Sequence, residues 1–164
     1  MTRGGVLLAV ALTLVMAPAT AAGQVAAQPD LMFVSRGGDV LTGDDLYNDD
    51  GVGQQRNVVV DQRVSLTLRI ENEGDQPAEF VVRGSVPGAG FAVKYFYEGV
   101  DIASELESEG YPLSVPGGSF EKVKVVVRVS DPPFGAEQDV LITASSGTAR
   151  DAVRITVTNV STTG

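Results

Sequence analysis

Alternation of apolar and polar residues is the feature that most limits what this chain can fold into. Residues 64–70 place valine, leucine or isoleucine at every second position, with Ser65, Thr67 and Arg69 between them. Residues 122–129 repeat the pattern with alternate valines, and Val126 is the one apolar residue on the polar side. Because successive side chains of a strand point to opposite faces, both segments are predicted to be strands with one buried face.

Turn residues divide the rest of the chain into further segments of strand length. Glycine, asparagine, aspartate and proline gather at residues 71–77, 115–118 and 131–135, as turns require. Shorter apolar or alternating runs fall at residues 30–34, 80–82, 91–97, 140–144 and 153–157, and residues 101–110 predict either a helical turn or an acidic loop. Antiparallel strands with one wet face pack as two sheets. The predicted fold class is therefore an all-β, immunoglobulin-like antiparallel β-sandwich of about seven to eight strands.

The N-terminal residues have the layout of a secretory signal peptide. Arg3 precedes an apolar run over residues 6–17, and small residues with A-x-A-type cleavage sites follow at 19–21 and 25–27. The run is shorter than the about 20 apolar residues that span a bilayer. We expect a signal peptide at residues 1–27 with cleavage near 21–27, an immunoglobulin-like domain at 28–160 and a short tail at 161–164. The mature protein is then expected to be secreted or periplasmic and not membrane-spanning.

The residue types that the chain lacks narrow its chemistry. It has no histidine, cysteine or tryptophan, which excludes a Ser–His–Asp triad, a cysteine nucleophile and disulfides, and makes zinc unsuitable. The formal net charge of −9 repels nucleic acid. We therefore expect neither an enzyme nor a nucleic-acid-binding protein. Carboxylate-based glycoside hydrolysis is the one catalytic chemistry that the composition leaves open.

The segment LTGDDLYNDDGVGQQR at residues 41–56 concentrates polar oxygen atoms between predicted strands. Calcium prefers carboxylate, amide and carbonyl oxygens on a turn that glycine permits. The candidate calcium ligands are Asp44, Asp45, Asn48, Asp49 and Asp50. Their spacing does not fit an EF-hand loop, and the alternative is a polar connection whose Asp and Asn side chains cap their own turns. No other cofactor is expected.

An aromatic run at Tyr95, Phe96 and Tyr97 is the second candidate site. On a strand, Phe96 faces away from the two tyrosines, so one side must carry aromatic surface. One interpretation is a binding surface for a sugar or a protein. The other is core packing with a hydrogen-bonded tyrosine.

Two longer stretches resemble a known kind of domain. VSLTLRIENEGDQPAEFVVRGSVP (64–87) and LSVPGGSFEKVKVVVRVSDPPFGAEQDVLITASS (113–146) are similar to the two halves of exported bacterial and archaeal Ig-like modules of the CARDB and NEW3 kind. DDLYNDDGVGQ (44–54), followed by FAVKYFYEGVDI (91–102), resembles a variant repeated in large bacterial surface proteins. The resemblance covers residues 29–157 and implies a spacer, an adhesion unit or an accessory domain beside an enzyme.

These observations predict a secreted, non-catalytic immunoglobulin-like domain that serves as a cell-surface or extracellular interaction or structural module. Its expected partner is another exported protein or an envelope component. One alternative is a calcium-dependent adhesion or carbohydrate-binding module. The other is a self-assembling fibre or coat subunit, in which the short apolar strand at residues 30–34 pairs with a neighbouring molecule.

Overall fold

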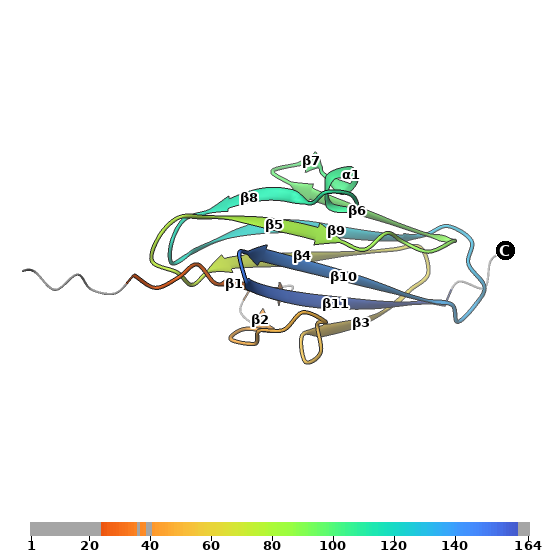
Figure 1. Cartoon of the computed structure of the whole chain (residues 1–164). Coiled ribbons are helices and arrows are strands. Elements are labelled where there is room, and N and C mark those ends of the chain that lie inside the picture. The colour runs from red at the N-terminus through yellow and green to blue at the C-terminus, as the bar shows by residue number, and fades with distance from the viewer. Residues whose placement is uncertain (1–23, 36, 39–40, 161–164) are drawn as a thin grey trace, which may run out of the picture.

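The fold consists of two β-sheets packed face to face over one core, and Figure 1 labels their strands. The computed structural model describes residues 24–35, 37–38 and 41–160. Residues 1–23 of the predicted signal peptide and the predicted tail at 161–164 lie outside the described residues. Residues 24–28 lead to the first strand without regular structure, and Ala27 among them packs against the core.

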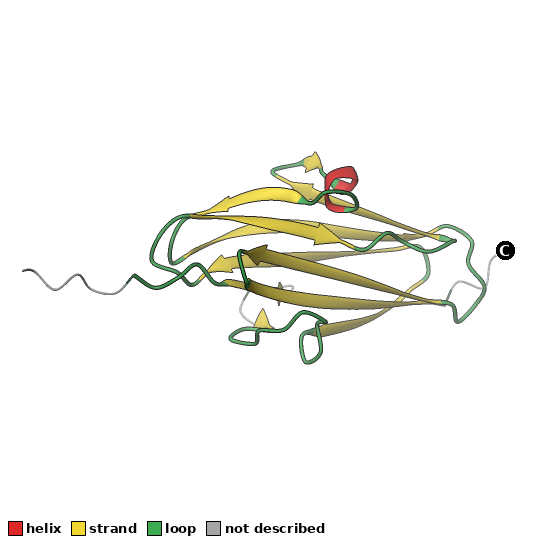
Figure 2. Ribbon diagram, in the orientation of Figure 1, coloured by secondary structure: helices red, strands yellow, loops and turns green. Residues whose placement is uncertain are grey.

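Among the described residues, eleven strands form the two sheets. Figure 2 shows that strands make up most of the fold. The first sheet has the order β2-β1-β4-β9-β6-β7 and contains β1 (Pro29–Val34), β2 (Leu41–Thr42), β4 (Arg63–Asn72), β6 (Phe91–Tyr97), β7 (Val100–Asp101) and β9 (Ser119–Val129). The second sheet has the order β3-β11-β10-β5-β8 and contains β3 (Gln55–Val60), β5 (Ala78–Gly84), β8 (Tyr111–Val115), β10 (Glu137–Ser146) and β11 (Ala149–Asn159). Within the described residues the strand pairs are antiparallel, except that β3 runs parallel to β11.

Seven of these strands have the order of a constant-type immunoglobulin domain. In that fold, strands A, B, E and D form one sheet and strands C, F and G form the other. Here β1-β4-β9-β6 and β5-β10-β11 occupy these positions, so the predicted immunoglobulin-like β-sandwich is confirmed. The other four strands are insertions, with β2 and β3 between strands A and B, and β7 and β8 between strands D and E.

The alternating apolar residues of both sheets form one core. Their buried members include Leu68, Ile70, Val123, Val125, Val127, Val140, Ile142, Val153, Ile155 and Val157. These are the residues that the period-two pattern places on the inner faces, so this prediction is confirmed. Each fully buried side chain of this kind contributes about 1.5–3 kcal/mol, which explains how a chain without cysteine holds the sandwich together.

Strand β1 is covered by another strand over only part of its outer edge. It pairs with β4 from Pro29 to Val34, and Phe33 and Val34 also pair with β2. The side chains of Leu31, Met32 and Phe33 are at most 1% exposed. The fold therefore uses the apolar side chains of this strand, whereas β2 covers its outer backbone only at Phe33 and Val34, so pairing of residues 30–34 with another molecule stays a prediction.

The predicted helical turn at residues 101–110 is present as the short helix α1 (Ala103–Leu106). Ala103 and Leu106 turn inward and are buried. Asp101 Oδ1 accepts a hydrogen bond of 3.1 Å from Ala103 N at the start of the helix. In the part of the chain that the structure describes, no helix has the length and apolar character needed to cross a membrane.

Tyr95 extends from β6 across the core to the second sheet. Its side chain is completely buried, and a Cβ atom placed on Gly84 at the end of β5 would lie 2.5 Å from its hydroxyl oxygen. The hydroxyl has no hydrogen-bond partner among the described residues, and burial raises the pKa of Tyr95. The ring therefore fits between the sheets because residue 84 has no side chain.

We expect Tyr95→Phe to raise the free energy of unfolding by about 1 kcal/mol, because it removes a buried hydroxyl that lacks a partner. Urea unfolding followed by circular dichroism measures the change as a shift in midpoint at constant m value. Tyr97→Phe is the matched comparison, since the Tyr97 hydroxyl hydrogen-bonds with Glu121, and its loss should be neutral or destabilising. Lower stability of Tyr95→Phe would show that the hydroxyl is bonded after all.

Candidate metal centre

One buried carboxylate holds the acidic loop, defined as residues 43–54, against the sandwich. Asp151 lies near the start of β11 and is completely buried. Its Oδ2 accepts a hydrogen bond of 2.6 Å from Leu31 N in β1. Its Oδ1 accepts hydrogen bonds from Asn48 N at 3.1 Å and from Gln54 Nε2 at 2.9 Å. Burial raises the pKa of Asp151, and these hydrogen bonds limit the rise because they favour the ionised carboxylate.

Gln54 and Arg154 hold the far end of the acidic loop. Gln54 is completely buried, and its Nε2 donates to Leu46 O as well as to Asp151. The guanidinium of Arg154 donates to Asp50 O from Nε at 3.1 Å and from Nη2 at 2.7 Å. The acidic loop is therefore fixed to β11 along most of its length.

Two of the predicted calcium ligands cap turns inside the acidic loop. Asn48 Oδ1 accepts hydrogen bonds from Asp50 N at 3.2 Å and Gly51 N at 2.5 Å, and Asn48 Nδ2 donates to Val52 O at 3.0 Å. Asp50 Oδ1 accepts a hydrogen bond of 2.9 Å from Val52 N. This is the self-capped polar connection that the sequence offered as the alternative to calcium.

The five predicted ligands are not brought together. Asp44 and Asp49 are exposed, and neither belongs to the one cluster of three potential metal-ligating side chains found among the described residues. Asp45 alone of the five belongs to it. Asp45 is therefore the one predicted ligand that joins this cluster, since Asn48 Oδ1 and Asp50 Oδ1 accept hydrogen bonds from backbone N–H groups, and calcium binding by the other four stays a prediction.

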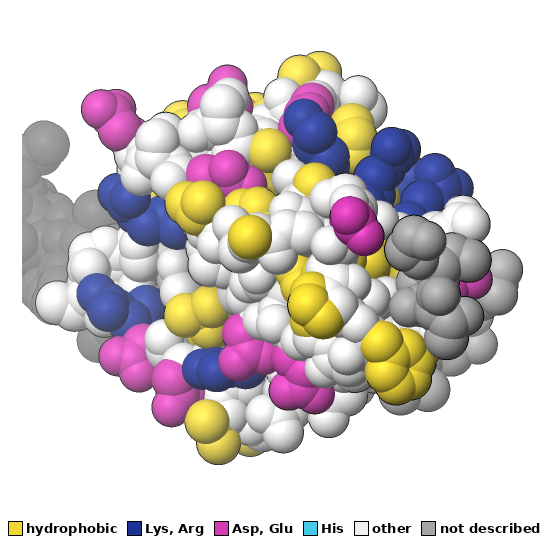
Figure 3. Space-filling model, turned by 90° about the vertical axis from the view of Figure 1, so that its right-hand side faces the viewer, with side chains coloured by type: hydrophobic (Ala, Val, Ile, Leu, Met, Phe, Trp, Pro, Cys, Tyr) yellow, Lys and Arg dark blue, Asp and Glu magenta, His cyan; other side chains and the backbone are white. Residues whose placement is uncertain are grey.

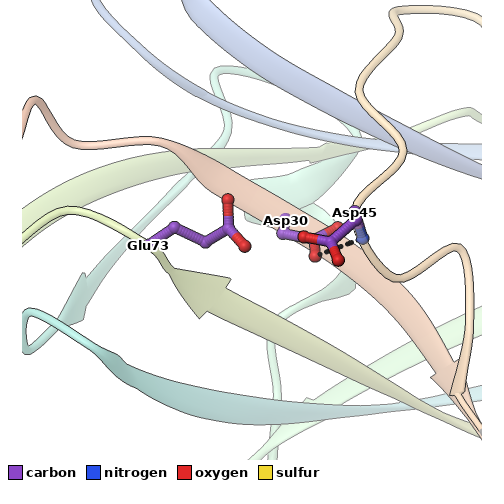
Figure 4. Close-up of side chains that lie close together, drawn as sticks. All are labelled: Asp30, Asp45 and Glu73. Atoms are coloured by element: carbon purple, nitrogen blue, oxygen red, sulfur yellow. Dashed lines mark hydrogen bonds between the residues drawn. The ribbon is translucent and has the colours of Figure 1, made fainter.

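Asp45 meets carboxylates from two other segments, as Figure 4 shows. Asp30 lies in β1, Asp45 in the acidic loop and Glu73 just after β4, and one carboxylate oxygen of each lies within 4.8 Å of the others. Asp45 N donates a hydrogen bond of 3.1 Å to Asp30 Oδ2. The hydroxyl of Tyr47 donates to Glu73 Oε2. We call Asp30, Asp45 and Glu73 the carboxylate cluster.

Asp30 is the buried member of the carboxylate cluster. It is 1% exposed, whereas Asp45 and Glu73 are exposed to solvent. Burial raises the pKa of Asp30 to about 7, the hydrogen bond from Asp45 N opposes the rise, and the charges of Asp151, Glu73 and Asp44 add to it. A buried carboxylate among other carboxylates is costly unless a proton or a cation neutralises it.

Local sequence patterns predict the burial of Asp151, but they do not predict that Asp30 and Glu73 meet. Asp151 has the same parity in its strand as Val153 and Ile155, so the alternation places it on the inner face, and this signal is enough to predict a buried carboxylate. Asp30 opens an apolar strand, and Glu73 lies in a turn rich in polar residues. Neither pattern indicates that the two residues meet, because only the pairing of β1 with β4 brings them together.

The aromatic run of Tyr95, Phe96 and Tyr97 is divided between two faces. Tyr95 is inside the core, so the prediction that it forms part of a binding surface is wrong. Tyr97 is partly buried against the core, and its ring centroid lies 6.0 Å from that of Tyr111. Phe96 is the member that lies on the outer face of the first sheet, where it lines a hollow.

The outer face of the first sheet collects basic side chains. Across β4 and β9, Arg63 is opposite Arg128, Thr67 is opposite Lys124, and Arg69 is opposite Lys122. We define the basic face as Arg63, Arg69, Lys94, Lys122, Lys124 and Arg128, together with Phe96 and Phe120. Figure 3, which views one end of the sandwich, shows lysine and arginine side chains gathered at the upper right beside hydrophobic ones.

The centre of the basic face combines free charge with aromatic surface. Phe120 is 39% exposed, with Arg69 Cζ 4.0 Å and Lys122 Nζ 5.4 Å from its ring centroid. A hollow of about 390 Å³ is lined by Thr67, Phe96, Glu98, Gly99, Lys122 and Lys124. Within the described residues, Lys122 and Lys124 form no salt bridge, whereas Arg69 pairs with Glu71 and Lys94 pairs with Asp101.

Comparison with known proteins supports the fold and assigns no family. The N-terminal domain of PorA superposes with a TM-score of 0.53 at 9% identity, over 80% of this chain and 97% of that one. A family 123 glycoside hydrolase from Clostridium perfringens superposes with a TM-score of 0.51 at 5% identity, over 82% of this chain but only 27% of the hydrolase. Likeness at such identities shows the fold alone. No family model and no curated protein matches the chain, so the CARDB and NEW3 resemblance stays a prediction.

Proposed function

We propose that this protein is an exported, non-catalytic immunoglobulin-like interaction module that binds an acidic protein partner through the basic face. One observation carries the proposal: cationic side chains are concentrated on one sheet of an acidic chain. Six of the 12 lysine and arginine residues lie on the basic face, including every lysine, although the net charge is −9. Complementary charge of this kind steers association and selects partners.

The chemistry of the basic face suits carboxylates carried by a protein segment. Lys122 and Lys124 flank the hollow without a salt-bridge partner among the described residues. Phe96 and Phe120 place apolar surface beside these charges. Protein interfaces commonly place aromatic side chains at the centre and charges around them. An acidic segment with some apolar side chains can therefore neutralise the lysines and cover the rings together.

Export and the lack of catalysis are the parts of the proposal that the sequence supports. Residues 1–27 have the layout of a signal peptide, and the chain has neither histidine nor cysteine. The PorA domain and the hydrolase share only the fold with this chain, so they bear on neither part. Mass spectrometry of the protein recovered from the native host tests export. An uncleaved N-terminus in the cytoplasmic fraction would contradict it.

We expect the double substitution Lys122→Glu and Lys124→Glu to weaken binding of a fluorescent polyglutamate peptide by about tenfold or more, because it replaces attraction with repulsion at the hollow. Fluorescence anisotropy at low ionic strength measures the affinity. The matched control is Arg83→Glu with Arg150→Glu, which makes the same change in charge at exposed positions of the second sheet. The control should weaken binding by less than about threefold, since screening limits distant charges.

Equal losses in the two double variants would show attraction to overall charge and would contradict a defined basic face. Amide chemical shifts provide a second readout, and peptide-induced changes should fall on β4, β6 and β9. Light scattering tests the nature of the partner. The wild type could be found to be a dimer that the double substitution Lys122→Glu and Lys124→Glu dissociates. In that case the partner is a second copy of this chain and not a foreign protein.

A further inference from the structure

The carboxylate cluster is the feature that neither the fold nor the basic face explains. Figure 4 shows Asp30 and Asp45 side by side, with the carboxylate of Glu73 turned toward them. One oxygen of each lies within 4.8 Å of the others, a separation at which like charges repel strongly. The three residues come from β1, the acidic loop and the turn after β4, so folding itself creates this concentration of negative charge.

Asp30 adds an independent observation that points to a ligand. Its side chain is 1% exposed. Its Oδ2 accepts the hydrogen bond from Asp45 N, but its Oδ1 has no partner among the described residues. Buried polar atoms in proteins are nearly always partnered, and buried charges are paired or bound to metal ions. An unpartnered buried oxygen beside two other carboxylates is the arrangement expected of a cation ligand.

We propose that Asp30, Asp45 and Glu73 bind one divalent cation and that the cation is calcium. Every donor in the cluster is a carboxylate oxygen, which hard cations prefer, and the chain contains no histidine or cysteine to favour a softer metal. Asp45 and Glu73 are exposed, so water can complete the about six to eight oxygen ligands that calcium takes. The hydrogen bond from Tyr47 to Glu73 Oε2 fixes this carboxylate at the cluster.

The surrounding contacts prepare the cluster for a cation. Asp151 already anchors the acidic loop through Asn48 N and Gln54 Nε2, so Asp45 is held in place without a bound ion. Preorganisation of this kind reduces the conformational entropy lost on binding. Calcium then cross-links β1, the acidic loop and the turn after β4. Extracellular calcium sites have dissociation constants of about 10⁻⁴–10⁻³ M.

Isothermal titration of the chelator-treated protein with calcium chloride tests the site. We expect one calcium site per chain, with a dissociation constant of about 10⁻³ M or lower. Asp45→Asn should weaken calcium binding by about tenfold or more, because it removes a charged ligand. Asp49→Asn is the matched control, since Asp49 is exposed in the same loop, lies outside the cluster and is not among the charges that act on Asp30. The control should bind calcium as the wild type does.

Terbium luminescence excited through tyrosine gives a second, local readout, because the Tyr47 hydroxyl contacts Glu73. We expect sensitised terbium emission from the wild type. Added calcium should displace the terbium and remove this emission, and Glu73→Gln and Asp45→Asn should abolish it. Asp30→Asn should also abolish it. If Asp30→Asn does not fold, the variants Glu73→Gln and Asp45→Asn, which change exposed residues, still test the site. No heat and no sensitised emission in the wild type would overturn the proposal. Equal losses in Asp49→Asn and Asp45→Asn would also overturn it, since they would indicate general attraction to the loop.

Discussion

Replacing Asp151 with alanine should lower the free energy of unfolding by about 3–5 kcal/mol. The substitution leaves Leu31 N, Asn48 N and Gln54 Nε2 without the acceptor that they share. Gln54 Nε2 keeps Leu46 O as an acceptor, whereas a buried donor that loses its only partner costs about 1–3 kcal/mol. The acidic loop and β1 also lose their common link to β11. Asp151→Asn should be destabilising as well. Its amide NH2 group is a donor and cannot accept the hydrogen bond of the N–H group that it would face.

Urea unfolding of the variants measures the loss, and Asp139→Ala provides the control. Asp139 lies in the neighbouring strand β10, and it accepts hydrogen bonds from Arg154 Nη1 at 3.1 Å and Thr156 Oγ1 at 2.7 Å. Its side chain is 52% exposed, so its loss should cost about 1 kcal/mol or less. Similar losses at Asp139 and Asp151 would contradict the role of the buried carboxylate. Proteolysis should in addition cut the acidic loop faster in Asp151→Ala than in Asp139→Ala.

The second large effect is expected at Gly84, where even alanine should lower the free energy of unfolding by about 3 kcal/mol. A Cβ atom at this position would lie 2.5 Å from Tyr95 Oη and 2.6 Å from Tyr95 Cζ. Real Cβ contacts are not this short, so the tyrosine must move. It has no free space to move into, because its side chain is completely buried in a close-packed core.

A double-mutant cycle separates this clash from any other effect of the substitution. Tyr95→Leu alone should be destabilising, because it leaves space in the core. In that background, Gly84→Ala should cost less than about 1 kcal/mol, since the clashing atoms are absent. Denaturant unfolding of the four proteins gives the coupling energy. The same cost of Gly84→Ala in both backgrounds would show that the contact with Tyr95 does not decide the result.

The sandwich could be predicted because its determinants are local. The alternation in residues 64–70 and 122–129 sets the inner faces of β4 and β9, and the turn at residues 115–118 separates β8 from β9. The parallel pairing of β3 with β11 could not be predicted in this way. Strands β3 and β11 are far apart in the sequence. Polar and apolar residues in Gln55–Val60 alternate too weakly to indicate a strand.

The candidate site was harder to predict because its members come from different segments. A search along the acidic loop finds Asp45 beside Asn48 and Asp50, yet the last two use their side chains to cap turns. The partners of Asp45 lie in β1 and just after β4. Asp30 is buried because these segments pack together. The spacing of residues within one loop does not predict such packing.

The position of Asp151 and of the parallel pair on β11 has a consequence for the order of events during synthesis. Ribosomes make the chain from its N-terminus, so β11 is the last of the described strands to emerge. Until then, β3 lacks its neighbour and the acidic loop lacks its anchor. Closure by such distant contacts is slow. The nascent polypeptide can therefore complete the second sheet and anchor the acidic loop through Asp151 only after β11 has been synthesised.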